Sequence, residues 1–221
     1  MSIRASVACA ITCLALGAPS LALLGCGSST PEPTTAADDV PPPPPEPKKK
    51  PKPKCEAVDE NCVATPDTQA RVAGSELVFI PPEGWSFAQE KELTRTFEKS
   101  GGAVLAMSSY EPGAEEAKTR EALFEALAEA LEIALPEKFK RKYKPNWAKP
   151  DDKRASGDTE LLLWQAGDAK HGAEKGYLLV LLAPDPAGRK VMGLAFAPES
   201  NEAAAEVIMK SLETLGPGSY Q

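Results

Sequence analysis

The sequence predicts an α+β domain over residues 75–221, with a mostly antiparallel sheet of about six strands packed by two helices. Three observations lead to this fold class. Short β-type runs are bounded by turn-forming residues, two longer segments carry apolar side chains at helical spacing, and the runs are grouped rather than alternating singly with helices. The expected order of elements is therefore βββαβββα, and a segment of this length is sufficient for one hydrophobic core.

The six expected strands are rich in β-branched, aromatic and leucine side chains. Pro-Pro-Glu-Gly, Ser-Gly-Gly, Gly-Asp and Pro-Asp-Pro clusters separate several of them and are typical of turns. The last three follow one another through short connections, so we expect them to form an antiparallel meander. The six segments are 76–80, 93–98, 103–109, 159–166, 177–183 and 190–197.

The first expected helix covers residues 115–135. Leucines occur at every fourth position from Leu123 to Leu135, which places them on one face of a helix, and Pro136 cannot continue it. Glu121, Glu125 and Glu129 repeat at the same spacing, and we expect them to form a solvated face rather than an acid–base site.

The second expected helix covers residues 200–214. An apolar stripe that includes Val207, Ile208 and Leu212 recurs at helical spacing. Ser200 or Asn201 is a candidate N-cap, because a short polar side chain can accept a hydrogen bond from the first turn. The Gly-Pro pair at 216–217 marks the end of the helix.

The segment LVFIPPEGWSF resembles the opening of PsbP-like domains, in which a strand runs into Pro, Gly and Trp, here Pro82, Gly84 and Trp85. The order of the following elements is also similar, over about residues 75–215. This resemblance implies an antiparallel sheet between helices and a role in binding or assembly rather than catalysis. The shared motif is structural and indicates no functional residue.

Residues 1–25 have the layout of a secretory signal peptide, with Arg4 ahead of an uncharged apolar run. Leu23, Gly25 and Cys26 resemble the lipobox of bacterial lipoproteins, in which the cysteine receives a diacylglycerol and becomes the first residue after cleavage. Loss of residues 1–25 and lipidation of Cys26 would leave an even pair of cysteines, as expected in an oxidising compartment. A membrane-spanning helix and ordinary cleavage near residue 22 are the alternatives.

Residues 26–54 are expected to form a disordered tether. Within 31–54 there are ten prolines and five lysines, and Val40 is the one large apolar side chain. Such a composition cannot bury enough surface to offset the entropy of ordering, and proline favours extended polyproline II. One interpretation of the tether is a spacer that carries the domain away from the membrane, and the alternative is a disordered linker with no specific role. A third possibility is that its lysines contact anionic lipid headgroups.

Residues 55–74 are expected to form a disulfide loop and the boundary of the domain. Cys55 and Cys62 are the remaining cysteines, and with one distant histidine, His171, they supply too few ligands for zinc. We expect a disulfide between them and no metal site. His171 itself is expected to be exposed in a hairpin loop.

Residues 136–154 concentrate positive charge, with eight basic and three acidic side chains in a domain that is acidic overall. Phe139, Tyr143 and Trp147 are spaced by four, and Arg141 lies among them. These four residues form the candidate binding surface, because aromatic rings among cations can stack on sugars or lie at headgroups. The alternative is that the three rings pack onto the sheet while the lysines remain in water.

The chain carries a net charge of −7, which argues against nucleic acid as its main partner. No catalytic motif is apparent, so we expect a protein that is not an enzyme and has no cofactor. The sequence thus predicts a lipid-anchored cell-envelope lipoprotein, facing the periplasm or the cell surface and leaning toward the outer membrane. Its domain is expected to be a non-catalytic binding or assembly module for an envelope glycan, a lipid phosphate or an acidic protein. The alternative is a carrier of a small apolar ligand, and an enzyme ranks third.

Overall fold

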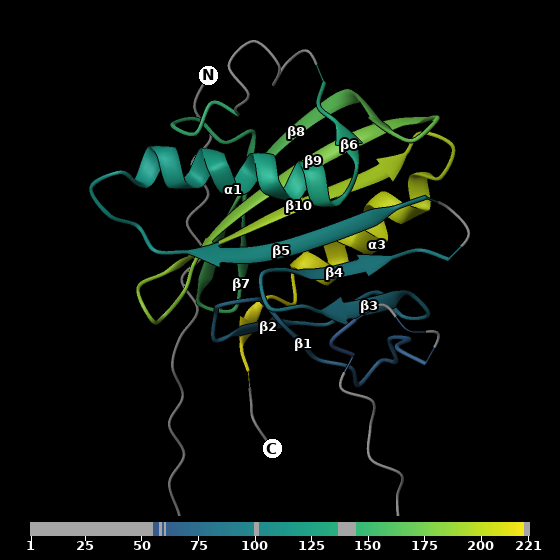
Figure 1. Ribbon diagram of the computed structural model, residues 1–221, viewed down its shortest axis with the longest axis horizontal. Coiled ribbons are helices and arrows are strands. Elements are labelled where there is room, and N and C mark those ends of the chain that lie inside the picture. The colour runs from purple at the N-terminus through teal and green to yellow at the C-terminus, as the bar shows by residue number, and fades with distance from the viewer. Residues whose placement is uncertain (1–54, 58, 60, 100–101, 137–144, 219–221) are drawn as a thin grey trace, which may run out of the picture. The chain divides into compact units, whose positions relative to one another are not determined.

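A computed structural model describes residues 55–57, 59, 61–99, 102–136 and 145–218. The chain divides into two units, Met1–Lys49 and Lys50–Gln221, and all described residues belong to the second. The predicted signal peptide, Cys26 and the tether lie outside the described residues. Everything below concerns the folded unit (Figure 1).

An eight-stranded antiparallel sheet forms the centre of the unit. Seven strands follow the spatial order β3-β4-β5-β10-β9-β8-β6, and β7 also pairs with β8. The predicted meander is confirmed, because β8, β9 and β10 are consecutive antiparallel neighbours. The bounds are β3 Ser86–Gln89, β4 Thr94–Phe97, β5 Val104–Tyr110, β6 Ile133–Ala134, β7 Asp152–Ser156, β8 Thr159–His171, β9 Glu174–Pro184 and β10 Lys190–Pro198.

A second, three-stranded sheet lies beside the first and has the order β1-β2-β11. Its strands are β1 Ala70–Arg71, β2 Leu77–Phe79 and β11 Gly216–Pro217. Because β11 follows the last helix and pairs with β2, this small sheet joins the two ends of the described domain. The expectation of about six strands was therefore too low, since the two sheets together contain eleven.

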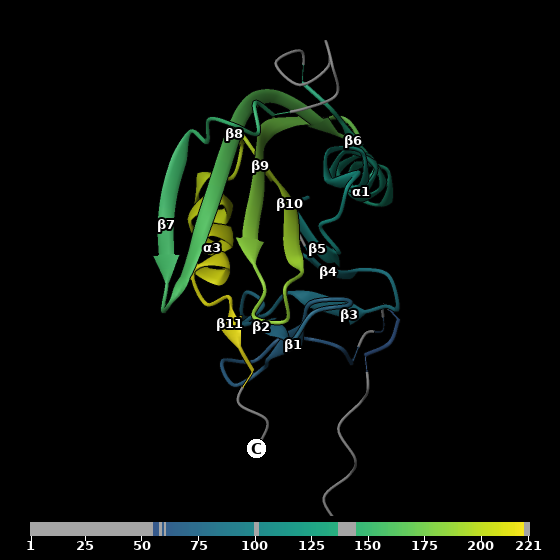
Figure 2. The same ribbon diagram turned by 90° about the vertical axis from the view of Figure 1, so that its left-hand side faces the viewer.

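Two helices pack on opposite faces of the large sheet (Figure 2). Helix α1 spans Glu116–Ala130 and buries Phe124, Leu127 and Ala128. It ends earlier than the leucine repeat predicted, because Glu132 adopts a left-handed φ of 53° and the chain then enters β6. An exposed glutamate in this conformation terminates the helix before the repeat is complete.

Helix α3 spans Glu202–Leu212 and begins as predicted at Asn201, whose side chain accepts a hydrogen bond from the Ala204 N–H. Its apolar stripe lies against the large sheet and the small sheet, together with Leu77, Phe79 and the cystine. On the other face of the large sheet, which helix α1 covers, a separate apolar cluster surrounds Trp164 and Phe196. The domain therefore has one core layer on each side of the sheet.

Candidate functional site

Three members of the candidate binding surface, Phe139, Arg141 and Tyr143, lie outside the described residues. The fourth, Trp147, is described, and it packs inward. Its ring makes edge-to-face contacts with Trp164 at 5.1 Å and with Phe124 at 6.0 Å between ring centroids. The Arg120 guanidinium lies 4.8 Å from the Trp147 ring centroid. For this one ring, the arrangement favours the packing alternative, because an aromatic residue held on three sides offers little surface to a partner.

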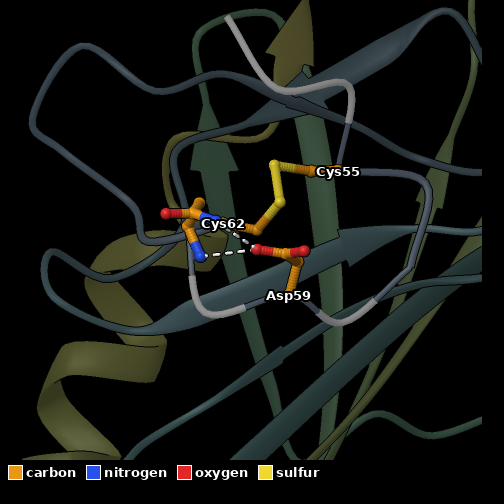
Figure 3. The surroundings of a disulfide bond; sticks show 4 residues. Cys55, Asp59 and Cys62 are labelled. Carbon is orange, nitrogen blue, oxygen red and sulfur yellow. Dashed lines mark hydrogen bonds between the residues drawn. A yellow bond between two sulfur atoms is a disulfide. The ribbon is translucent and has the colours of Figure 1, made fainter.

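Cys55 and Cys62 lie at disulfide distance with their Cα atoms 5.5 Å apart (Figure 3), which is the usual separation in disulfides. Between them, the Asp59 carboxylate accepts hydrogen bonds from the Asn61 N–H and side-chain amide, and these bonds lower the pKa of Asp59. The loop is thus closed both by the cystine and by a local turn.

The cystine loop is attached to the outer edge of β3. The carbonyl groups of Cys55 and Cys62 accept hydrogen bonds from the Gln89 and Phe87 N–H groups, at 2.6 and 2.9 Å. Backbone groups of a sheet edge are otherwise open to pairing with another chain. The loop therefore covers this edge of the large sheet at the start of the described residues.

A pocket of about 270 Å³ lies between helix α3 and the large sheet. Small side chains leave it open: Ala195 and Ala197 on β10 form part of its floor, and Ala205 contributes from the helix. A larger residue at any of these positions would fill space that the alanines leave. The complete lining is Gln165, Ala166, Gly167, Tyr177, Leu178, Leu179, Ala195, Ala197, Ala205, Ile208 and Met209.

The strand β8 contributes an irregularity to the rim of this pocket. Its pairing with β9 shifts register between Ala166 and Ala169, and Asp168 adopts a left-handed φ of 61°. Such a bulge re-aims neighbouring side chains and is frequent next to functional sites. Beside it, Tyr177 on β9 is 49% exposed, one of the two large hydrophobic residues exposed among the described ones.

The chemistry of the lining favours an apolar ligand. The polar side-chain groups in it are the Gln165 amide and the Tyr177 hydroxyl, and the remaining residues are aliphatic or lack a side chain. Ligand sites are typically concave and apolar with a few orienting polar groups, although most exceed about 300 Å³. The pocket is therefore suited to a small apolar ligand or to one apolar arm of a larger one.

His171 differs from its prediction as an exposed loop residue. It is the last residue of β8 and is partly buried. Its Nδ1 lies 3.0 Å from the Gly102 carbonyl oxygen, and its ring packs at 5.6 Å from that of Phe196. The backbone contact and the ring packing give this histidine a structural role at the end of the hairpin.

Glutamates 125 and 129 are exposed on α1, as expected for a solvated helix face, and Glu121 is partly buried. Within the described part of the chain, no group of three or more histidine, cysteine or carboxylate side chains could hold a metal ion. In the same part, no helix has the length and apolar character needed to cross a membrane.

Sequence reasoning did not find the pocket. The alanines that form it are ordinary helix or strand residues in the sequence, and they meet only after β8, β9, β10 and α3 come together. Comparison of the chain with protein-family models and with curated proteins gives no match. The functional argument therefore depends on the geometry of the domain itself.

Proposed function

We propose that this chain is a lipid-anchored protein of the bacterial cell envelope whose folded domain is a non-catalytic binding module. The observation that carries the binding role is the apolar pocket between α3 and the sheet, with a half-exposed tyrosine at its rim. Binding of an apolar ligand in such a pocket is favourable, because apolar surface of both the ligand and the lining is removed from water.

The anchor is proposed from the lipobox-like residues around Cys26, and the tether from the proline-rich segment that follows. Two acyl chains hold a protein stably on a membrane. The proposed location is the outer membrane, facing the periplasm or the cell surface. The PsbP-like resemblance is consistent with this picture, because it implies an antiparallel sheet between helices and a binding or assembly role.

The segment 136–154 is proposed as a second contact surface, for an envelope glycan, a lipid phosphate or an acidic protein. Its support is the concentration of positive charge around Phe139, Arg141 and Tyr143. Trp147 would then act as the anchor of this segment on the domain, since its ring packs against Trp164 and Phe124.

The pocket is tested by filling it from the helix. Ala205 lines the pocket, whereas Ala203 on the same helix is exposed and lies outside the lining. We expect Ala205→Leu to weaken binding of the neutral apolar dye Nile red at least about tenfold, because the added methyl groups occupy the space the dye needs.

The dye is titrated into the full chain carrying Cys26→Ser, so that neither a lipid anchor nor detergent competes with the protein. Ala203→Leu is the matched control and should bind as the parent does. Thermal unfolding of all three proteins checks that the fold is unchanged. Equal dye affinity in Ala205→Leu and Ala203→Leu would remove the pocket as the binding site.

A further inference from the structure

We propose that the ligand of the apolar pocket is a single hydrocarbon chain with an uncharged polar head, bound with its tail toward β10 and its head at β8. This inference rests on the binding role proposed above and specifies the chemistry of the ligand. Three features of the pocket support it: the layout of the floor, the change in exposure from one end to the other, and the groups at the open end.

The floor of the pocket consists of two rows of residues that run across the large sheet from β8 to β10. Gln165, Leu179 and Ala195 are direct partners in neighbouring strands and form the first row. Tyr177 and Ala197 are partners in the second row, two residues away along their strands and therefore on the same face of the sheet. Neighbouring strands lie about 4.8 Å apart, so three strands give the floor a length of about 10 Å.

The inner side and the roof of the pocket are closed by packed residues. The next row inward contains Leu181 and Gly193, which are both buried, and a Cβ atom at Gly193 would already lie 3.4 Å from the Leu181 Cβ atom. The roof is one face of α3, formed by Ala205, Ile208 and Met209. A ligand can therefore lie along the floor but cannot extend deeper into the core.

The pocket is open at β8 and closed at β10. At the β8 end, Gln165 and Gly167 are exposed, and a Cβ atom added at Gly167 would meet no described atom within 4 Å beyond its chain neighbours. Leu179 on β9 is partly buried, and Ala195 on β10 is 1% exposed. Because exposure falls along the first row, the part of a ligand that enters first comes to lie against β10.

The charges around the open end favour an uncharged head. Among the described lining residues there is no Asp, Glu, Lys, Arg or His. The charged residues next to them in the chain are Asp168, Glu206 and Lys210, which are all exposed and of which two are acidic. A carboxylate or phosphate head would thus lose part of its hydration without gaining a cation from the lining.

Two polar side chains at the open end can bind a neutral head instead. The Tyr177 hydroxyl and the Gln165 amide can each both donate and accept a hydrogen bond. Tyr177 is 49% exposed and Gln165 is exposed, so a hydroxyl, ester or amide head can bond to them and remain near water. Polar groups at the open end and aliphatic ones at the closed end match a molecule with one polar and one apolar end.

The volume of the pocket sets the length of the chain that it holds. A methylene group is close in size to a water molecule, which takes up about 30 Å³, so a pocket of about 270 Å³ accommodates about nine carbons. The remaining carbons of a longer chain would lie outside the pocket and add little to the affinity.

Displacement of Nile red from the full chain carrying Cys26→Ser tests both the tail and the head. Straight-chain alcohols from hexan-1-ol to dodecan-1-ol should bind about fourfold more tightly with each methylene up to about nine carbons, and then level off. Nonan-1-ol should bind at least about tenfold more tightly than nonanoate at neutral pH. The proposal is overturned if affinity keeps rising at the same rate to dodecan-1-ol, or if nonanoate binds as well as nonan-1-ol.

A cation placed at the open end tests where the head lies. Gln165→Lys should strengthen nonanoate binding about tenfold, because an ammonium group then meets the carboxylate. Gln69→Lys is the matched control, since Gln69 is exposed and outside the lining, and it should bind nonanoate as the parent does. Equal nonanoate affinity in the two variants would show that the head does not lie at β8.

Failure of the ligand assignment and failure of the pocket give different results. If Nile red binding is weakened by Ala205→Leu and not by Ala203→Leu, the pocket is supported whatever the alcohols do. Equal displacement by nonan-1-ol and nonanoate then removes only the assigned ligand. If the two alanine variants bind Nile red equally, the pocket is removed as the binding site, and the assigned ligand with it.

Discussion

The Asp185 carboxylate, in the β9–β10 turn, accepts hydrogen bonds from the Ser75 hydroxyl and from the Glu76 N–H at 3.2 Å. A third bond comes from the Ala187 N–H at 2.8 Å. Asp185 is 4% exposed, so it links the β1–β2 and β9–β10 turns from inside the domain. Burial raises its pKa, but the three hydrogen bonds and the charge of Arg189 outweigh burial, and the pKa of Asp185 is lowered.

Acid should therefore weaken the domain through Asp185. A carboxyl group whose pKa is lower in the folded state stabilises the fold above its unfolded pKa of 3.8, and this stability is lost as the pH falls through the folded value. We expect Asp185→Asn to lower the free energy of unfolding at pH 7 by about 1–3 kcal/mol. The asparagine NH₂ group is itself a donor, so it cannot accept the hydrogen bonds that the carboxylate accepts from Ser75, Glu76 and Ala187. The substitution should also flatten the pH dependence below about pH 4.

Urea unfolding at a series of pH values measures both effects. Asp158→Asn is the control, since Asp158 is exposed in the β7–β8 turn, and it should change stability by less than about 0.5 kcal/mol. If Asp185→Asn and Asp158→Asn give the same pH profile, the Asp185 carboxylate does not stabilise the junction of the two turns.

Trp147 is expected to matter for stability. Its ring packs against Trp164 and Phe124, so Trp147→Ala should lower the free energy of unfolding by about 3 kcal/mol through lost contacts and a cavity. Tyr177→Ala, at a half-exposed aromatic residue, is the control and should cost about 1 kcal/mol or less. A loss from Trp147→Ala no larger than that from Tyr177→Ala would contradict the packing role.

Most of the strands that sequence patterns predicted contain apolar runs, as in β5, β8, β9 and β10. All six expected strands correspond to strands, namely β2, β4, β5, β8, β9 and β10, because burial on one or both faces selects their residues. Strand β7 was missed because its residues, DKRAS, carry no apolar pattern, and it is held at the sheet edge by its pairing with β8. Strand β3, SFAQ, was also missed, because its four residues show no apolar alternation. Strands β1, β6 and β11 are two residues long, too short for any periodicity.

The candidate sites were harder to predict than the fold. A pocket depends on small residues from several elements, and Ala195 and Ala205 give no signal of a cavity while they are separate in the sequence. The contact between the β1–β2 and β9–β10 turns likewise has no signal in the sequence, because the hydrogen bond from Ser75 to Asp185 joins residues that are far apart along the chain. Clusters of charge and aromatics along the chain, as at 136–154, are visible without a structure, but their orientation is not.

The cystine between Cys55 and Cys62 is expected to stabilise the domain by closing an eight-residue loop, which removes entropy from the unfolded chain. The chain-entropy relation gives about 2.5 kcal/mol for a loop of this size. Dithiothreitol should therefore lower the urea midpoint of the full chain by a corresponding amount. The double variant Cys55→Ser with Cys62→Ser should match the reduced protein and be insensitive to reductant. A midpoint unchanged by reduction would show that the pairing contributes nothing.

The Tyr110 hydroxyl is expected to lose its proton at a higher pH than an ordinary tyrosine. It is 4% exposed, and burial, assisted by the negative charge of Glu116, raises its pKa to about 12. A phenol whose folded pKa is raised contributes stability that is complete below its unfolded pKa of 10.0 and is lost as the pH rises toward the folded value.

Absorbance at the phenolate band follows this titration, with circular dichroism as a check that the protein remains folded. Tyr110→Phe should remove one tyrosine equivalent near pH 12 and leave the rest of the curve unchanged. If the parent chain and Tyr110→Phe both show the ionisation step near pH 12, that step belongs to another tyrosine. The burial argument for Tyr110 would then be contradicted.

Membrane attachment is expected to depend on Cys26 alone among the cysteines near the N-terminus. The wild-type chain should fractionate with membranes, and Cys26→Ala should release it, because the remaining tether is too polar to insert. Cys13→Ala is the matched control, since Cys13 lies in the predicted leader, and it should remain membrane-bound. The mass of the N-terminal peptide should show a diacylglycerol on Cys26. A Cys26→Ala chain that stays in the membrane would instead favour residues 5–25 as an uncleaved apolar anchor, since this run is just long enough to span a bilayer.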